Sequence, residues 1–393
     1  MKKRKIFPLG MKSMSIITST IIASIFLSCN HAHRQSAYIG GEDIDMSISL
    51  VDSVRLSADS ISWTGNFLSH KGMLGFADRY YCKLYLFDWD SGKLIDKMMG
   101  HGHSKSEIEE LIYVYPIYNA KNRIAIVDSN LRLTVFNTET REKERISYLG
   151  DVPFSNEDIG NYASPGVYSL MEMAEFGSDF YQLSPDELLI PLSLIDRRLN
   201  SIDSDRYKKG HIWGRFNQKT NVIEKLSGHF PTYYKDNPAP NFEHFRYVKI
   251  EDNYYVNHTV DSLIYVYNGQ DSLLYTFGRE AENADRSYTG QNYETSIKCM
   301  RDDAKRVSLN SGLLYLEDAQ LLLRETVHQL LGDFPHTTIQ LYDYKTGNLV
   351  GEQTFDCFKH FLYGKGNNLF AVTGFSNEED IYYIYKFEIK KDK

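Results

Sequence analysis

Two histidines at alternate positions are the side chains in this sequence that could most readily hold a metal ion. His101 and His103 lie in the glycine-containing stretch Gly100–Glu107. Alternate residues of a strand point to one face, so both imidazoles could reach the same Zn²⁺, with Glu107 as a third ligand. The stretch also fits a plain connecting turn with solvated histidines. We expect the turn, predict no metal, and keep His101 and His103 as candidate ligand-binding residues.

These histidines directly follow a β-hairpin that recurs along the chain. In the first copy, Lys83–Asp96, an apolar run ends at Asp88, and Gly92 precedes the second strand. Asp or Asn can bond the backbone of a turn, and Gly supplies the positive φ that short hairpin loops need. We therefore interpret Asp88 as a turn residue and not as a catalytic carboxylate. The same position in later copies is occupied by Asn137, Asn217, Asn268 and Asp343.

Each hairpin is preceded by a further strand, and the period is about fifty residues with two insertions. A four-stranded unit of this length, repeated radially, is a propeller blade. The composition also favours strands, because 29 Tyr, 21 Phe and 3 Trp make up 13% of the chain and aromatic residues suit pleated surfaces. We predict an all-β fold, a six-bladed β-propeller of four-stranded antiparallel blades.

The last predicted blade lacks one strand. Phe358–Tyr363, Leu369–Phe375 and Ile381–Ile389 supply three strands, and an unpaired edge is a liability for a sheet. Ser47–Leu56 has apolar residues at even spacing but no local hairpin partner. We predict that this N-terminal strand completes the last blade, so that residues 46–393 form a single propeller domain.

The innermost strand of each blade lines the central channel of a propeller, where ligands commonly bind. We expect these strands near residues 63–69, 112–118, 168–173, 245–250, 296–300 and 358–363. Residues 292–306 also fit a short polar helix. Within or beside the inner strands, His70, Glu172 and His360 are the candidates for metal or acid–base chemistry. Three converging carboxylate or amide ligands are not visible in the sequence.

Aromatic side chains of the predicted inner strands offer a different kind of site. Tyr115, Tyr118, Tyr247 and Tyr363 could stack on a sugar or a peptide. The alternative is that these rings pack between neighbouring blades. We take Tyr115, Tyr118, Tyr247, His360 and Tyr363 as candidate ligand-binding residues at the channel mouth, and we assign no catalytic residue.

The N-terminus has the features of an export signal. Basic residues between Lys2 and Lys12 precede an apolar run, Ile16–Leu27, which is shorter than a membrane span. Phe26–Cys29 resembles a bacterial lipobox, which implies that residues 1–28 are removed as a signal peptide and that Cys29 is lipidated. Residues 29–45 are polar and glycine-bearing, so we predict a flexible tether.

Charge and cysteine content limit the possible partners. The net charge is −8 and no basic stripe is present, so we expect no nucleic-acid partner. Beyond the lipobox, Cys82, Cys299 and Cys357 are an odd number at scattered positions without a CxxC pair. A disulfide framework or a zinc site is therefore not expected, although one bridge stays open.

The lipobox, the blade repeat and the stretch Gly100–Glu107 together resemble the TolB-like six-bladed propeller lipoproteins of Bacteroidetes. The resemblance covers nearly the whole mature chain, and it implies a fold and a compartment but no chemistry. We expect a membrane-anchored outer-membrane lipoprotein on the periplasmic face, because no acidic residue directly follows Cys29.

The expected function is non-enzymatic, a binding or assembly module for a protein, peptide or glycan at the channel mouth, without a cofactor. A metal-dependent lactonase or hydrolase acting on a carbohydrate derivative is the alternative, since propellers of that type share the blade count.

Overall fold

The computed structural model describes residues 37–57, 60–148, 162–171, 180–194, 204–288, 296–373 and 382–392. The chain divides into two compact parts, Met1–Ala37 and Tyr38–Lys393. The description below concerns the second part. The predicted signal peptide, Cys29 and the first residues of the predicted tether lie outside the described residues.

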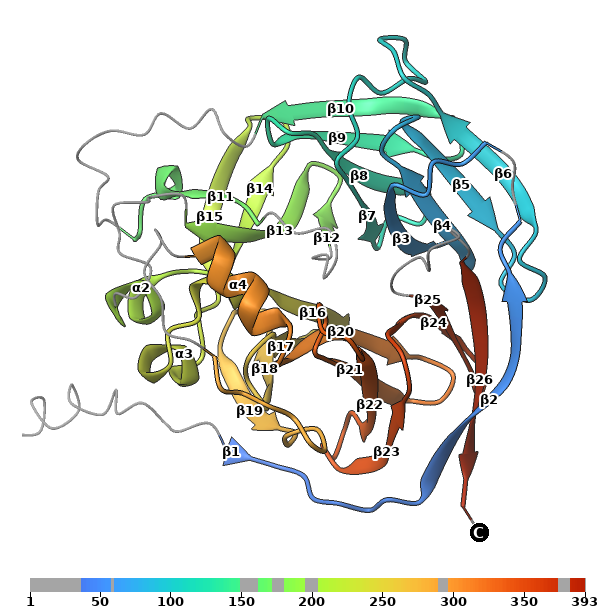
Figure 1. Cartoon of the computed structure of the whole chain (residues 1–393). Coiled ribbons are helices and arrows are strands. Elements are labelled where there is room, and N and C mark those ends of the chain that lie inside the picture. Colours follow the sequence, from blue (N-terminus) through green and yellow to red (C-terminus); the bar gives the residue numbers. More distant parts are fainter. Residues whose placement is uncertain are drawn as a thin grey trace, which may run out of the picture. The chain divides into compact units, whose positions relative to one another are not determined.

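Most of the regular structure is β-strand, and the strands follow one another in antiparallel groups that we number as units (Figure 1). The first unit contains β3 (Gly65–His70), β4 (Met73–Asp78), β5 (Lys83–Phe87) and β6 (Leu94–Met99). The second contains β7 (Tyr113–Tyr118), β8 (Arg123–Val127), β9 (Arg132–Asn137) and β10 (Glu142–Tyr148). The third contains β11 (Tyr168–Leu170), β12 (Phe180–Ser184), β13 (Glu187–Leu194), β14 (Trp213–Asn217) and β15 (Val222–Ser227).

Three further units complete the described strands. The fourth contains β16 (Phe245–Ile250), β17 (Asn253–His258), β18 (Ile264–Asn268) and β19 (Leu273–Phe277). The fifth contains β20 (Ser308–Leu316), β21 (Leu321–His328), β22 (His336–Asp343) and β23 (Leu349–Phe355). The sixth contains β24 (Lys359–Lys365), β25 (Asn368–Thr373), β26 (Tyr383–Lys391) and, from the other end of the chain, β2 (Met46–Arg55).

The predicted completion of the last group by an N-terminal strand is confirmed. β2 pairs antiparallel with β26 from Met46 opposite Lys391 to Arg55 opposite Tyr383. Ile48 of β2 is buried in the same cluster as Phe387 of β26. The strand therefore contributes both ladder hydrogen bonds and apolar burial to the sixth unit.

The residues that precede β2 are also hydrogen-bonded, although we expected them in the tether. β1 (Ala37–Tyr38) pairs with β19, and the backbone N–H of Ile39 donates to Thr276. The N–H of Asp43 donates to Leu349 of β23, and beyond β2 the N–H of Ser57 donates to Gly92. Residues 37–57 thus run along the fourth, fifth, sixth and first units in turn. We call this segment the N-terminal belt.

Hydrophobic clusters fill the space between each unit and the next. They join the first unit to the second, the second to the third, the third to the fourth, the fourth to the fifth and the fifth to the sixth. A further cluster joins Phe76 and Phe87 of the first unit to Val372 and Ile384 of the sixth. Burial on both faces explains why the strands carry apolar residues at consecutive positions.

Two units are linked more closely than the others. β7 and β12 pair in parallel, with Ile117 opposite Phe180 and Tyr118 opposite Tyr181. This pairing merges the second and third units into one nine-stranded sheet, in which β11 and β12 pair with successive parts of β13. The sequence prediction did not include this parallel ladder.

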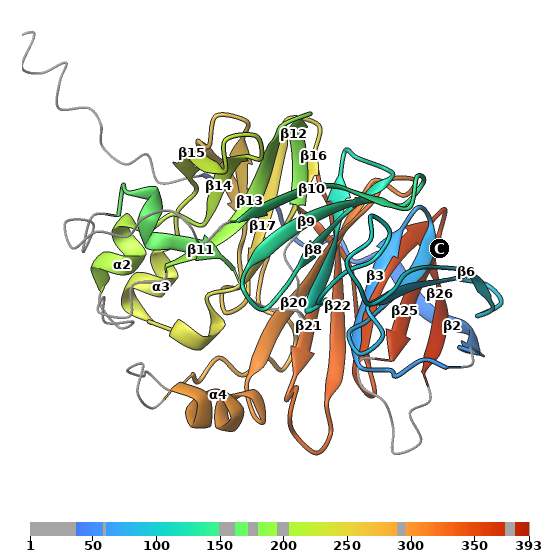
Figure 2. The same ribbon diagram turned by 90° about the horizontal axis from the view of Figure 1, so that it is seen from above.

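Antiparallel pairing places the loops at two opposite ends of the units. One end, which we call the turn end, carries short connections such as 71–72, 185–186 and 366–367. The other, the insertion end, carries the longer ones, with α2 (Ser204–Lys209), α3 (Thr232–Asp236), α4 (Ser296–Ala304) and the 3₁₀ turn η3 (Pro240–Phe242). Figure 2 shows these α-helices beyond the same end of the strands. None of the helices among the described residues is long and apolar enough to cross a membrane.

The predicted turn chemistry is confirmed in each hairpin copy. Asp88 accepts the backbone N–H of Ser91 at 2.8 Å, and Asn137 accepts that of Glu139 at 2.9 Å. Gly92 adopts a φ of 64°, a conformation that a side chain disfavours. Equivalent hydrogen bonds to backbone N–H groups are made by Asn217, Asn268 and Asp343.

One predicted inner strand is wrong. Residues 296–300 form the first part of α4, in agreement with the polar-helix alternative, and β20 occupies the inner position of the fifth unit. Ser296–Met300 and the true inner strand, β20, both precede the same hairpin within one insertion. The spacing of the repeat therefore does not distinguish one from the other. In the third unit, β12 and not 168–173 pairs with β7.

Candidate functional site

Three predicted site residues lie at the insertion end. His101 and His103 are exposed in the loop after β6. His360 is the second residue of β24, where its ring is half-buried between the fifth and sixth units. Its Nδ1 lies against the carboxylate of Glu325, so His360 belongs to a different cluster from the two loop histidines.

The loop of His101 and His103 is held by its own backbone. The N–H of Gly102 donates to Ile108, and the N–H of Ile108 donates to Gly100. The carboxylate of Glu107 accepts the N–H of Ser104 at 3.0 Å, and this hydrogen bond lowers the pKa of Glu107. Glu107 is therefore engaged within the loop. Among the described residues, no three His, Cys, Asp or Glu side chains are grouped to hold a metal ion.

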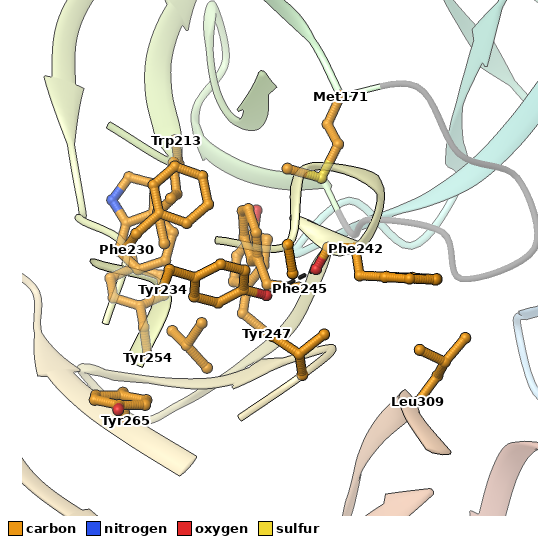
Figure 3. Close-up of a cluster of buried hydrophobic side chains, with 14 of the residues drawn as sticks. Met171, Trp213, Phe230, Tyr234, Phe242, Phe245, Tyr247, Tyr254, Tyr265 and Leu309 are labelled. Carbon is orange, nitrogen blue, oxygen red and sulfur yellow. Dashed lines mark hydrogen bonds between the residues drawn. The ribbon is translucent and has the colours of Figure 1, made fainter. Parts of the chain in front are cut away.

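Two of the predicted tyrosines are buried in the core. Tyr115 packs against Phe180 with ring centroids 5.3 Å apart, between the second and third units. Tyr247 is fully buried beside Trp213 and Phe245, as Figure 3 shows. Both rings pack between neighbouring units, which was the alternative to ligand binding, and neither ring is exposed to solvent.

Tyr118, at the turn end of β7, combines exposure with a rigid support. Its ring stacks on that of Tyr181, with centroids 4.8 Å apart and planes at 19°. Tyr181 packs in turn on Tyr247 at 5.1 Å, and its hydroxyl accepts the backbone N–H of Lys249 at 2.9 Å. Tyr118 keeps 37% of its surface exposed. We call Tyr118, Tyr181 and Tyr247 the tyrosine column.

The column exists because of the parallel ladder. β7 and β12 place Tyr118 directly opposite Tyr181, and β16 contributes Tyr247 from the next unit. A ring that is fixed by stacking on a neighbour loses little freedom when a ligand binds its exposed part. The arrangement can therefore supply a flat, preorganised stacking platform at the turn end.

Tyr363 is also near the turn end, but it lies on β24 of the sixth unit. Its ring stacks on Trp89 of the first hairpin, with centroids 5.5 Å apart and planes at 11°. Trp89 is buried and Tyr363 is half-buried, in the cluster that joins the sixth unit to the first. Tyr363 thus contributes to the contact between these units, and it does not join the tyrosine column.

The partner of His360 is a carboxylate that sequence reasoning missed. Glu325 lies on β21 and is completely buried. Its oxygens accept hydrogen bonds from Ser311 Oγ at 2.5 Å, His360 Nδ1 at 3.1 Å and the backbone N–H of Phe361 at 2.7 Å. The carboxylate is therefore held by three donors from the fifth and sixth units.

The order of these groups determines what they can do. In a serine hydrolase the imidazole lies between the serine and the carboxylate, so that it can take the serine proton. Here Glu325 lies between Ser311 and His360, and both donate to it. The cluster has the pattern of a structural clamp between the two units and not of an activated nucleophile.

Some of these residues leave a signal in the sequence. Arg324 and Glu325 follow three leucines in a fully buried strand, and charged residues at buried strand positions are usually paired. Arg324 is fully buried and donates to Gln340 Oε1 at 2.9 Å. Tyr181 has no such signal, because one tyrosine among many does not indicate which ring it contacts.

The strand pairing and the contacts between consecutive units define a mostly-β, β-propeller-like protein. No family model matches the sequence, and no curated protein matches it. Two crystal structures share the fold. A member of the DUF4221 family from Bacteroides vulgatus has a TM-score of 0.66 at 10% identity, covering 89% of this chain and 100% of that one. A proposed exported protein from Bacteroides fragilis has a TM-score of 0.51 at 14% identity, covering 90% and 100%.

These similarities concern the fold, and they agree with the predicted likeness to propeller-like proteins of Bacteroidetes. They do not show that the protein is TolB-like.

Proposed function

We propose that the protein is an exported, lipid-anchored binding module built as a closed six-bladed β-propeller of the TolB-like kind, with each unit as a blade. The clusters between all consecutive units support this arrangement, in particular the one that joins the first unit to the sixth. The pairing of β2 with β26 supplies the closure.

The proposed ligand is a glycan that stacks on Tyr118 at the turn end. The observation that carries this proposal is the exposed ring of Tyr118 fixed on the buried part of the tyrosine column. A sugar presents an apolar face of C–H groups that packs on such a ring, and the ring gives up little side-chain entropy on binding. The proposed role is non-enzymatic, and the arrangement of Ser311, Glu325 and His360 as a clamp is consistent with it.

A glycan array probed with the purified protein tests the ligand. We expect binding to a subset of glycans that is lost in Tyr118→Ala and weakened in Tyr118→Leu, which keeps bulk without the ring. Tyr80→Ala is the matched control, because Tyr80 is 73% exposed at the insertion end. Equal losses in both alanine variants, or binding to no glycan on the array, would contradict the proposal.

The anchor has its own test, because Cys29 and the signal peptide lie outside the described residues. In the cells that make the protein, we expect a labelled fatty acid to be incorporated and the protein to fractionate with the outer membrane, accessible from the periplasm. Cys29→Ser should abolish the label and release the protein from membranes. Label incorporation by the Cys29→Ser variant would refute lipidation at this residue.

A further inference from the structure

A polar cavity lies between the second and third units, on the face of the β7–β12 ladder opposite the tyrosine column. Its volume is about 180 Å³. Ile117, Val135 and Leu188 form apolar walls, while guanidinium, carboxylate and amide groups from the turn end line the rest. The cavity is separate from the proposed glycan platform, because Ile117 and Tyr118 are consecutive strand residues with opposite side-chain directions.

Two acceptor side chains of the lining, Glu144 and Gln182, are already engaged by donors of the protein. Arg123 Nε lies 2.6 Å from Glu144 Oε2, and Asn137 Nδ2 donates to Glu144 Oε1 at 2.6 Å. The Oε1 atom of Gln182 accepts from Arg123 Nη1 at 3.1 Å. Few acceptor positions in the lining remain for a ligand that donates hydrogen bonds.

Donor groups are in excess. Gln218 lines the cavity and is 8% exposed, and its Nε2 has no hydrogen-bond partner among the described residues. A buried amide N–H without a partner has lost its hydrogen bonds to water and is costly to leave unpaired. Arg123 and Arg145 add five N–H donors each, of which only some are engaged by protein acceptors.

The charges around the cavity also favour an anion. The lining carries two guanidinium groups, Arg123 and Arg145, against the single carboxylate of Glu144. At the rim, Asp186 pairs with Arg145 at 2.8 Å and with Lys219 at 3.7 Å. These contacts lower the pKa of Asp186, so it stays charged, and the five groups together keep one positive charge in surplus.

We propose that this cavity binds a small organic carboxylate. The carboxylate supplies the acceptor that Gln218 lacks and balances the surplus charge, while a short carbon skeleton fills the space beside the apolar walls. A molecule between acetate and a hexuronate in size suits the volume. The same donors favour a carboxylate over a neutral sugar, since hydrogen bonds to a charged acceptor are stronger.

Isothermal titration calorimetry of the purified full chain at constant ionic strength tests this inference. We expect acetate or D-glucuronate to bind with one site per chain, while D-glucose and chloride produce no saturable heat. Binding of glucuronate alone identifies an acid sugar, and binding of both identifies a general carboxylate. No saturable binding of either acid, or equal binding of glucose, overturns the proposal.

Gln218→Met isolates the key donor with little change of shape. We expect affinity to fall about tenfold, because a hydrogen bond to a charged group is lost. Thermal stability should fall little, because the removed Nε2 group has no hydrogen-bond partner among the described residues. Gln353→Met on β23 is the matched control and should bind normally. Val135→Leu fills the cavity and should weaken binding independently. Unchanged affinity in both cavity variants contradicts the assignment.

Discussion

Glu325 and His360 are hydrogen-bonded across the contact between the fifth and sixth units, with Nδ1 and Oε1 3.1 Å apart. The carboxylate has no exposure to solvent and depends wholly on protein donors. Because Glu325 lies on β21 and His360 is the second residue of β24, the pair holds two consecutive units together at the insertion end.

Replacing this carboxylate tests its structural role. In Glu325→Gln one acceptor oxygen becomes an NH₂ group, which meets donors from Ser311, His360 or the backbone of Phe361. We expect the free energy of unfolding to fall by about 2 kcal/mol. Urea titration should show a lower midpoint with an unchanged slope.

Glu388→Gln serves as the matched control for this substitution. Glu388 lies on β26 with a partly exposed side chain and an exposed ion pair to Lys390, so a change below about 0.5 kcal/mol is expected. Equal destabilisation by the two substitutions would argue against the clamp.

Two tyrosines of the column should differ sharply in their effect on stability. Tyr247→Ala empties a fully buried site, which costs roughly 3–5 kcal/mol. Tyr118→Ala removes only a partly exposed stacked ring, which costs about 1 kcal/mol. Thermal and urea unfolding of the two variants provide the comparison. A loss for Tyr118→Ala as large as for Tyr247→Ala would show that Tyr118 belongs to the core.

Buried histidines predict a loss of stability in mild acid. Burial lowers the pKa of His70, His258 and His328 to about 4, 3 and 4, against an ordinary value near 6.5. Below pH 6.5 the unfolded chain binds protons that the folded chain does not, so stability is greatest above this pH. It falls as the pH decreases towards 4, by roughly 1.4 kcal/mol per pH unit for each histidine.

A single substitution can isolate one of these protons. His70→Gln keeps a donor for Thr138, which lies 2.9 Å from His70 Nε2, and removes the titration. The slope of unfolding free energy against pH between 6 and 4.5 should decrease by the contribution of one proton, roughly 1.4 kcal/mol per pH unit. Parallel slopes in wild type and His70→Gln would rule out a neutral buried His70.

The N-terminal belt predicts different outcomes for two truncations. Removing residues up to Asp45 deletes the hydrogen bonds to β19 and β23 but keeps β2, so the protein should keep the oligomeric state of the full chain with a modestly lower melting temperature. Removing residues up to Leu56 exposes the edge of β26, and we expect self-association through this edge.

Size-exclusion chromatography with light scattering separates these outcomes. A version beginning at Ala37 is the control and should match the full chain. A monomer of full stability without β2 would contradict the role assigned to the belt.

Cysteine reactivity should follow burial. The structure leaves Cys82, Cys299 and Cys357 as free thiols, which answers the disulfide question left open by the sequence. Cys82 is buried, and burial raises the pKa of its thiol, whereas Cys357 is exposed. Alkylation followed by mass spectrometry should label Cys357 first and Cys82 only on unfolding. Early labelling of Cys82 would indicate local opening of the first unit.

Much of the architecture is predictable from local sequence. Asp88 and Asn137 determine hairpin turns through hydrogen bonds to residues two or three positions away, so their effect is visible without any tertiary information. The even spacing of apolar residues in 47–56 likewise identifies β2 as a strand without a local partner.

Contacts between units are not predictable in the same way. The parallel ladder that places Tyr118 opposite Tyr181 joins strands of two different units, and neither residue type specifies that partner. The candidate site depends on this ladder. The sequence predicts Tyr115 and Tyr247 as ligand-binding residues, yet both are buried. The exposure of a tyrosine cannot be read from its position in a strand that is apolar on both faces.

The pairing of β2 with β26 also has a kinetic consequence. The ribosome releases β2 among the first strands and β26 among the last, so almost the whole sequence must emerge before the two can meet. The closing contact therefore has the highest sequence separation in the fold, and formation of such contacts is slow. Until then β2 remains an unpaired strand of alternating apolar residues. We therefore expect the pairing of β2 with β26 to be a late step of folding.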